Sequence, residues 1–207
     1  MKKLFLASFF TYSSQLLLPL LPKSPQELKL AFIPTASDPY DNKPWVFEDR
    51  NKLIQMGFDV FDVDLKNKTQ EALSKDLEKA DVVFVSGGNT YYLMEKVTKS
   101  RFGEVIKKLL DRGVIYVGSS AGTAIMCPTI EYLEDLDDRG MAKLDSFQGL
   151  GLIDFLILPH YGEPKYEKRF QNIIAKWKNK SYKIQTLTNN QAVTVEEKII
   201  KVMDTSC

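Results

Sequence analysis

Short apolar runs alternate with amphipathic stretches along most of the chain. The runs at 80–85 and 114–118 are rich in Val, Ile, Phe and Tyr, which is typical of parallel strands covered on both faces. Strands and helices that alternate at this spacing predict an α/β protein with a mostly parallel sheet. The predicted strands are 3–7, 28–33, 60–63, 80–85, 114–118, 155–158, 192–195 and 199–202, and the predicted helices are 47–56, 90–98, 101–110 and 166–177.

The end of the chain follows a different pattern, because no predicted helix separates its last two strands, 192–195 and 199–202. We expect the last three strands, 155–158, 192–195 and 199–202, to complete the sheet in antiparallel orientation. Asn189 and Asn190 are the candidate turn residues before the second of these strands.

A charge-free stretch at 4–22 follows two lysines and has the outline of a secretory signal. Polar residues at 11–15 interrupt it, and Pro19 and Pro22 break its far end, so a spanning helix of about 20 apolar residues is not expected. The stretch also lacks a small-x-small cleavage site. We interpret it as a buried strand followed by a short amphipathic segment, with a signal peptide as the alternative. The expectation is a cytoplasmic protein without a membrane partner.

Composition narrows the function further. The 207 residues are enough for one domain, placed at 1–207. The 28 Lys and Arg residues balance 27 Asp and Glu residues to a net charge of +1, which argues against a nucleic-acid partner. Cys127, Cys207 and one histidine, His160, cannot form a disulfide framework or a four-ligand zinc site. Any imidazole chemistry must therefore use His160. The sequence pattern indicates no particular oligomeric state.

The segment Gly118-Ser119-Ser120-Ala121-Gly122 lies between a predicted strand and a segment able to start a helix. This is the G-x-S-x-G pattern in the strand-turn-helix context of a nucleophile elbow. Ser120 is then the candidate nucleophile, and the amide of Ala121 is a candidate donor to an oxyanion. The alternative is a loop of small residues that cradles a phosphate.

A second glycine loop, 86–90, follows the strand at 80–85. Its consecutive glycines allow the main chain to present an amide, and Gly88 is the candidate second oxyanion donor. A phosphate-binding nest is the alternative, although neither G-x-G-x-x-G nor a P-loop pattern occurs here. Asn89 or Thr90 is the candidate N-cap of the next helix.

His160 follows the apolar run at 155–158, so it is expected at the same sheet edge as Ser120. A serine hydroxyl needs a base to accept its proton, and an imidazole suits that role. A packed or solvated histidine is the alternative. Acidic residues that could orient the imidazole crowd the segment between the two, although most of them fit a solvated loop; they are Glu131, Glu134, Asp135, Asp137 and Asp138.

Four motifs together resemble one family. They are Phe84-Val-Ser-Gly-Gly-Asn-Thr90, Val117-Gly-Ser-Ser-Ala-Gly122, Cys127-Pro-Thr-Ile130 and Pro159-His160. The sequence resembles the peptidase E (aspartyl dipeptidase) and cyanophycinase family of serine peptidases. The resemblance implies a doubly wound, flavodoxin-like α/β sheet similar to class I glutamine amidotransferases. It also implies a cytoplasmic enzyme that needs no metal or other cofactor.

The resemblance assigns roles to individual residues. Ser120 matches the family's nucleophile and His160 matches its base. Asp135 stands where peptidase E has an aspartate proposed for the charge relay. A competing glutamate of the family falls near Asn189, which departs from the pattern because an amide can orient an imidazole but supplies no charge. Asp135 and Asn189 therefore remain alternatives.

The implied substrates are dipeptides or short peptides, with an N-terminal aspartyl residue as the family's preference. An aspartyl side chain needs a cation, and Lys165 stands where peptidase E has an arginine after its Gly-Glu pair. Lysine lacks the bidentate geometry of arginine, so strict aspartyl specificity is not expected. Lys165 and Asn89 are the predicted substrate-binding residues, and an exposed basic helix face is the alternative for the lysine.

Two other functions fit the same motifs. An esterase could use the same elbow, although no HGGG-type oxyanion motif is present. A small-ligand or phosphate-binding α/β protein could use both glycine loops without catalysis.

Overall fold

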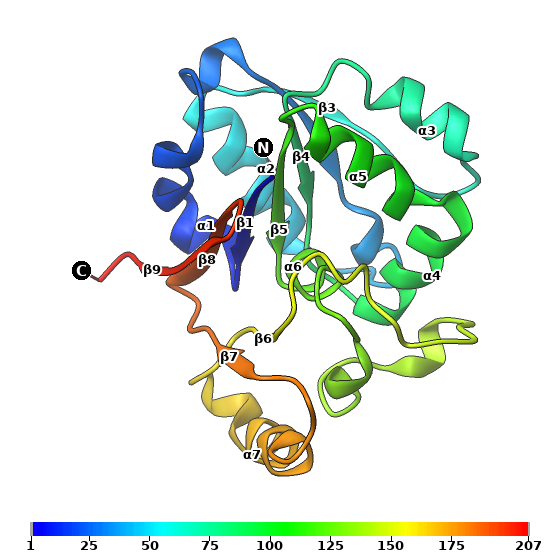
Figure 1. Ribbon diagram of the computed structural model, residues 1–207, viewed down its shortest axis with the longest axis vertical. Coiled ribbons are helices and arrows are strands. Elements are labelled where there is room, and N and C mark those ends of the chain that lie inside the picture. The colour runs from blue at the N-terminus through cyan, green and yellow to red at the C-terminus, as the bar shows by residue number, and fades with distance from the viewer. Residues whose placement is uncertain (1, 207) are drawn as a thin grey trace.

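A computed structural model describes residues 2–206 (Figure 1). Within them, seven strands form one sheet in the order β3-β2-β4-β5-β1-β8-β9, and β6 and β7 form a second sheet of two strands. The strands are β1 (Lys3–Ala7), β2 (Lys29–Ile33), β3 (Asp59–Asp62), β4 (Val82–Val85), β5 (Ile115–Ser119), β6 (Leu156–Leu158), β7 (Ile184–Thr186), β8 (Gln191–Glu196) and β9 (Ile199–Asp204). The predicted class, a doubly wound α/β protein with a mostly parallel sheet, is confirmed.

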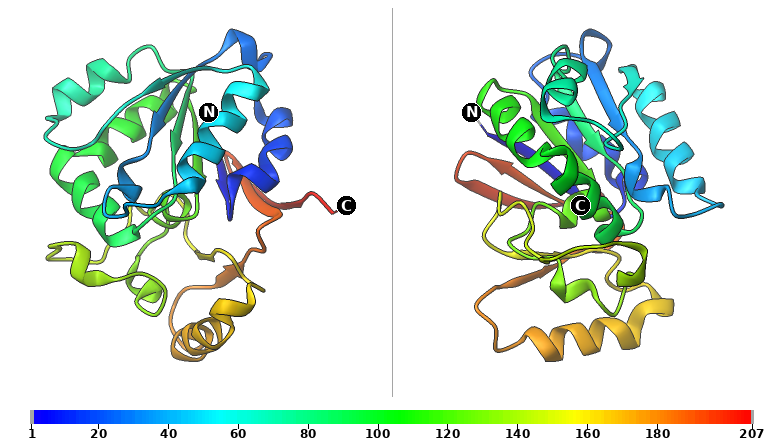
Figure 2. Two further views of the ribbon diagram at one scale, coloured as in Figure 1. Left: turned by 180° about the vertical axis from the view of Figure 1, so that it is seen from behind. Right: turned by 90° about the vertical axis from the view of Figure 1, so that its right-hand side faces the viewer.

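Helices cover both faces of the main sheet, as the two views in Figure 2 show. The α-helices are α1 (Phe10–Ser13), α2 (Pro44–Met56), α3 (Gln70–Asp76), α4 (Thr90–Ser100), α5 (Phe102–Asp111), α6 (Ala121–Ala124) and α7 (Glu167–Trp177). Short 3₁₀ segments lie at Ser14–Leu20, Pro25–Glu27, Thr35–Ser37, Glu131–Leu133, Arg139–Met141 and Pro164–Tyr166. The helix α3 was not expected from the sequence, because its seven residues include a single buried one, Leu73.

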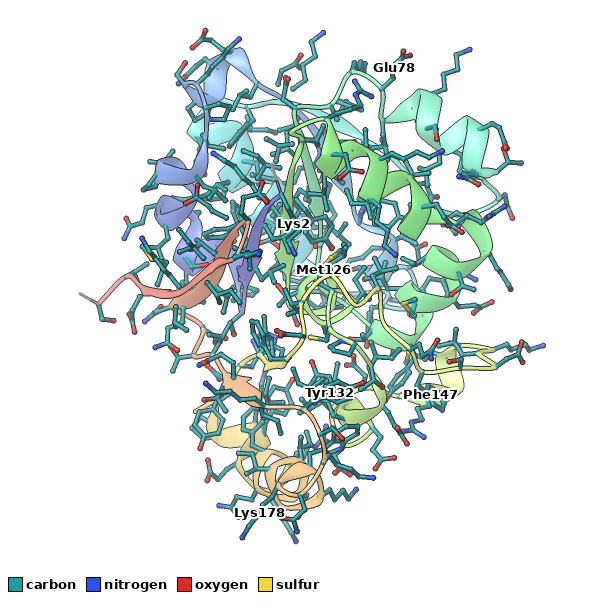
Figure 3. The ribbon with its side chains drawn as sticks, viewed as in Figure 1. Lys2, Glu78, Met126, Tyr132, Phe147 and Lys178 are labelled. Atoms are coloured by element: carbon teal, nitrogen blue, oxygen red, sulfur yellow. The ribbon has the colours of Figure 1, made fainter. Side chains whose placement is uncertain are left out.

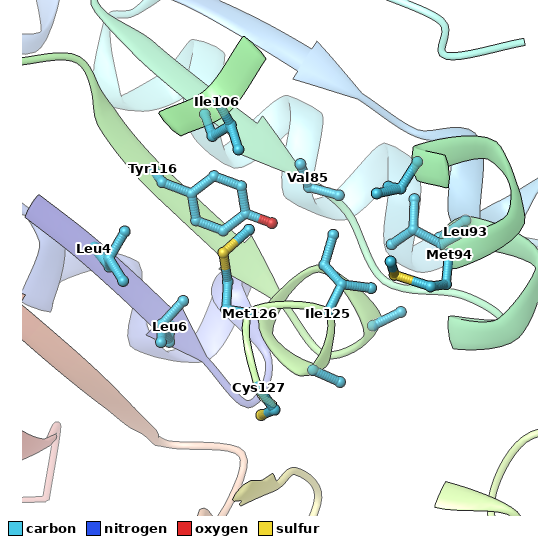
Figure 4. Packing of buried hydrophobic residues seen from close by; sticks show 14 of the residues in the cluster. Leu4, Leu6, Val85, Leu93, Met94, Ile106, Tyr116, Ile125, Met126 and Cys127 are labelled. Carbon is cyan, nitrogen blue, oxygen red and sulfur yellow. The ribbon is translucent and has the colours of Figure 1, made fainter. Parts of the chain in front are cut away.

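The side chains of β1 show how one strand serves two cores. Leu4 and Leu6 belong to a buried cluster that includes residues of α3, α4 and α5. Phe5 and Ala7 belong to the cluster on the other face, with residues of α1 and α2. Successive side chains of a strand point to opposite faces, so a strand buried on both faces is apolar throughout. Figure 4 shows Leu4 and Leu6 beside Tyr116 of β5 and Ile106 of α5.

The N-terminal stretch is folded into this core. β1 pairs in parallel with β5 and antiparallel with β8, so it is an interior strand of the main sheet. Among residues 2–206, no helix combines the length and the apolar composition that crossing a bilayer requires. Cys127 is buried with a free thiol, whereas Cys207 lies outside the described residues.

The prediction for the last three strands is correct only for two of them. β8 and β9 extend the main sheet in antiparallel orientation. β6 instead pairs in parallel with β7, a short and half-buried strand that the sequence pattern did not indicate. Beneath the main sheet in Figure 1, β6, β7 and α7 form a separate layer. Tyr132, labelled in Figure 3, links this layer to the segment after β5. Its hydroxyl donates to the Ile157 carbonyl, and its ring packs on Trp177.

Candidate active site

Ser120 lies in a sharp turn between β5 and α6. Its backbone has φ 50° and ψ −104°, a conformation that few non-glycine residues adopt and that costs about 1–3 kcal/mol. The flanking glycines permit this turn. A Cβ at Gly122 would lie 2.1 Å from the carbonyl oxygen of Val85, and one at Gly118 would lie 2.7 Å from the Gly122 carbonyl. The predicted elbow is therefore present, and close backbone packing explains its glycines.

The second glycine loop follows β4, the strand beside β5. Gly88 has φ 146°, and a Cβ there would lie 2.2 Å from the Ala36 carbonyl oxygen. Gly87 lies against the elbow, since its Cβ would be 3.3 Å from the Cβ of Ser120. Within residues 2–206, the N–H groups of Gly88 and Ala121 donate to no loop carbonyl or side chain. Gly88 lines the same cavity as Ser120, and Ala121 directly follows Ser120 in the chain.

Asn89 lies at the N-terminus of α4, directly after the second glycine loop. Its side chain is buried, and Oδ1 caps α4 by accepting from the Tyr92 N–H at 2.8 Å. Its Nδ2 donates to the Asp138 carbonyl at 2.9 Å. It does not line the cavity described below. The N-cap prediction for Asn89 is confirmed. Its contact with a substrate stays a prediction.

His160 follows β6 and faces the elbow from the smaller sheet. Its φ is 61°, and its N–H donates to the Ser8 hydroxyl at 2.7 Å, which in turn donates to the Leu187 carbonyl. The Nε2 atom lies 2.8 Å from Ser120 Oγ. Burial lowers the pKa of His160, against the opposing effect of its hydrogen bond with Asn189, so the ring is neutral near pH 7.

The other ring nitrogen decides between the two alternatives for the residue behind His160. Nδ1 lies 2.7 Å from Oδ1 of Asn189. Asp135 is elsewhere: its carboxylate pairs with Lys176 of α7 at 2.9 Å. Both ring nitrogens of His160 are therefore occupied without Asp135, and the expectation that Asp135 orients His160 is not met. Asp135 instead fastens the segment after the elbow to α7.

A cavity of about 520 Å³ opens beside Ser120 and His160. Aromatic side chains form much of its wall, and its charged residues are three acids and one lysine. Lys165 lies with its ammonium 4.8 Å from the ring centroid of Tyr166. The lining residues are Phe9, Tyr12, Tyr40, Pro44, Trp45, Glu48, Gly87, Gly88, Thr90, Ser119, Ser120, Leu133, Leu136, Asp137, Pro159, His160, Glu163, Lys165, Tyr166 and Asn189.

The sequence singled out none of the three acids in this wall, and two of them, Asp137 and Glu163, make hydrogen bonds within the site. Asp137 accepts the Thr90 N–H at 2.9 Å, and burial raises the pKa of its carboxyl. Glu163 accepts from Nδ2 of Asn189 at 2.6 Å. Asp137 was one of five acids in a crowded segment, and nothing in their spacing distinguishes it. Glu163 carries a weak signal, since it follows His160 by three residues across the turn at Gly162.

Asp49 is a buried carboxyl group on α2, behind the elbow. Its Oδ1 accepts from the Thr11 hydroxyl at 2.9 Å, and its Oδ2 is buried without a hydrogen-bond partner among the described residues. Burial raises the pKa of Asp49 to about 7. Elsewhere in the described part of the chain, no three His, Cys, Asp or Glu side chains converge as a bound metal ion requires.

Comparisons with known proteins agree with this geometry. The family model for peptidase family S51 matches residues 7–203. An uncharacterized peptidase of Pasteurella multocida is 34% identical over 204 residues, which cover 97% of this chain and 98% of that protein. A peptidase E of Streptomyces coelicolor is 34% identical over 140 residues, 68% of this chain and 54% of that protein.

A solved structure supports the same assignment. The crystal structure of a Listeria monocytogenes protein, proposed to be a peptidase E, has a TM-score of 0.91 and 28% identity. The match covers 99% of this chain and 98% of that one. The predicted resemblance to peptidase E is confirmed: this chain belongs to peptidase family S51, a family of serine peptidases.

Proposed function

We propose that the protein hydrolyses dipeptides and other short peptides from their N-terminal end through an acyl-enzyme on Ser120. The observation that carries the proposal is the 2.8 Å contact between Ser120 Oγ and His160 Nε2 at the edge of a cavity of about 520 Å³. This volume lies in the range of small-molecule sites, roughly 300–1,000 Å³, and suits a peptide of a few residues.

The chemical steps follow from the positions of the two side chains. His160 Nε2 accepts the Ser120 proton while Oγ attacks the scissile carbonyl carbon. The N–H groups of Gly88 and Ala121 donate to the oxygen that becomes negative. His160 then donates the proton to the leaving amine, and the C–N bond breaks. A water molecule, deprotonated by His160, cleaves the ester and regenerates Ser120.

The charges around the cavity support recognition of a free N-terminus. Asp137 presents a carboxylate in the wall, held in place by the Thr90 N–H. A carboxylate in a partly desolvated wall favours a cation, and a free peptide has an α-ammonium group at its N-terminus. Asp137 is thus the proposed anchor for the substrate amine. Because an acetylated N-terminus carries no charge, acetylated peptides should be poor substrates.

Lys165 is the proposed contact for an acidic first side chain. Among the described residues it is the one lysine or arginine that lines the cavity. Its ammonium is a point charge without the bidentate geometry of arginine, so the proposed enzyme prefers an N-terminal aspartate without requiring it.

The test is a screen of dipeptides with every first residue, each free and N-acetylated. Hydrolysis of free dipeptides, with at least roughly tenfold lower kcat/KM for the acetylated forms, is expected. The variant Lys165→Met should lose the preference for an N-terminal aspartate. Lys168→Met is the matched control, because Lys168 lies on α7 outside the cavity lining. Cleavage of esters alone, or binding without turnover, would contradict the proposal.

A further inference from the structure

Four polar side chains form a row that extends beyond His160. Ser120 Oγ lies 2.8 Å from His160 Nε2, and His160 Nδ1 lies 2.7 Å from Asn189 Oδ1. Asn189 Nδ2 lies 2.6 Å from Glu163 Oε1. The Glu163 N–H also donates to the His160 carbonyl at 3.1 Å, so one tight turn holds the glutamate and the imidazole together. We propose that Glu163 is a positioning residue that sets the direction of this entire hydrogen-bond row.

The direction follows from what each group can donate. An ionised carboxylate only accepts hydrogen bonds, so Asn189 must turn its NH₂ group toward Glu163. Its carbonyl oxygen then faces His160, and because that oxygen also only accepts, Nδ1 of His160 must carry a hydrogen. A neutral imidazole with hydrogen on Nδ1 has its lone pair on Nε2. Ser120 therefore finds an acceptor at Nε2.

Without Glu163 this direction would be undetermined. An asparagine side chain presents a carbonyl oxygen from one orientation and an amine from the other, so Asn189 by itself suits either form of the ring. With its amide reversed, Asn189 would donate to Nδ1, and the hydrogen of neutral His160 would move to Nε2. That form has no lone pair for the Ser120 proton. The Glu163 carboxylate excludes this tautomer through its hydrogen bond to Asn189, without a hydrogen bond of its own to Ser120 or to the imidazole ring.

Glu163 also supplies the charge that Asn189 lacks. Burial lowers the pKa of His160 and the nearby Lys165 cation lowers it further, whereas the hydrogen bond to Asn189 and the charge of Glu163 raise it. An imidazolium formed during a reaction is therefore stabilised by a carboxylate acting through the amide. In triads with an acid behind the histidine, one residue both orients the ring and supplies charge. Here Asn189 and Glu163 divide these two tasks.

The test uses the fact that the chain has a single histidine. The ¹⁵N resonances of His160 therefore report its tautomer and its pKa without ambiguity. In the wild-type protein the neutral ring should carry its hydrogen on Nδ1. In Glu163→Gln, whose amide can donate as well as accept, a mixture of tautomers and a lower pKa of His160 are expected. Glu167→Gln removes an equal charge from an exposed position at the start of α7 and should leave both quantities unchanged.

A second test uses enzyme kinetics. It rests on the proposed function, whereas the NMR measurement does not. Glu163→Gln should lower kcat on peptide substrates roughly tenfold with little change in KM, and the acidic limb of kcat/KM should move to lower pH as the pKa of His160 falls. Glu163→Asp keeps the negative charge and should show the wild-type tautomer of His160. If Glu163→Gln does not fold, the tautomer in Glu163→Asp tests the role of the carboxylate instead.

The two possible failures are distinguishable. A wild-type ring with hydrogen on Nε2, or the same tautomer and pKa in Glu163→Gln as in the wild type, would overturn the role of Glu163 even if peptides are cleaved. The expected tautomers in a protein that cleaves no peptide would leave the role of Glu163 in place and overturn the proposed function.

Discussion

The two sides of the candidate site are built in different ways. The elbow that holds Ser120 is part of the main sheet, and its shape depends on backbone packing between Gly118, Gly122 and the neighbouring β4. The side that holds His160 follows the smaller sheet and depends on hydrogen bonds between side chains in the loops after β6 and β7. Backbone packing leaves a glycine motif in the sequence, whereas side-chain hydrogen bonds across remote segments leave little trace.

The largest effect is expected at the elbow itself. Ser120→Ala should lower kcat on a cleaved dipeptide by roughly 10⁴-fold or more, because no other group can form the acyl intermediate. The melting temperature should stay near that of the wild type, since the one hydrogen bond that this hydroxyl makes with the described residues is to His160. Measured turnover within tenfold of the wild type would exclude Ser120 as the nucleophile.

The next largest effect tests the His160 side. Asn189→Ala should lower kcat/KM roughly 100-fold, because the Nδ1 hydrogen loses its acceptor and the ring loses its orientation. Asp135→Ala removes an ion pair with Lys176 at the surface and should change kcat/KM less than about twofold. The reverse ranking in steady-state kinetics would restore Asp135 as the partner of His160.

A glycine substitution measures how tightly the elbow is packed. Gly122→Ala places a Cβ 2.1 Å from a backbone oxygen of β4, and we expect a loss of about 3 kcal/mol or more in the free energy of unfolding. Gly151→Ala is the control. Its Cβ would meet nothing within 4 Å, and the cost should be about 1 kcal/mol from its φ of 60° alone. Equal losses in urea denaturation would refute the packing account.

The last prediction concerns Asp49 behind the elbow and its effect on stability at different pH values. Its folded-state pKa of about 7 lies above the ordinary value of 3.8, so the folded protein binds a proton that the unfolded chain has lost. Stability from this group is therefore present at low pH and is lost as pH rises toward 7, by up to about 1.4 kcal/mol per pH unit. Asp49→Asn should flatten the dependence of the unfolding free energy on pH between 4 and 7. An unchanged slope would mean that Asp49 is not protonated in the fold.

The same contrast explains what the sequence could predict. The parallel core and the elbow at Ser120 follow from apolar runs and glycine spacing, and His160 follows from being the single histidine. The partner of His160 stayed undecided between Asp135 and Asn189 because it depends on β7, whose residues Ile184–Thr186 form no apolar run. The role of Glu163 requires knowing which way an amide side chain faces, and residue spacing contains no such information.

Covalent labelling of Ser120 tests the central claim most directly. A preparation shown to cleave dipeptides is treated with a small fluorophosphonate, and the modified residue is located by mass spectrometry. One adduct on Ser120 is predicted, absent in Ser120→Ala and formed more slowly in His160→Ala, because the hydroxyl then lacks its base. An active preparation that gains no adduct on Ser120, or that gains the adduct on another residue, would contradict the account.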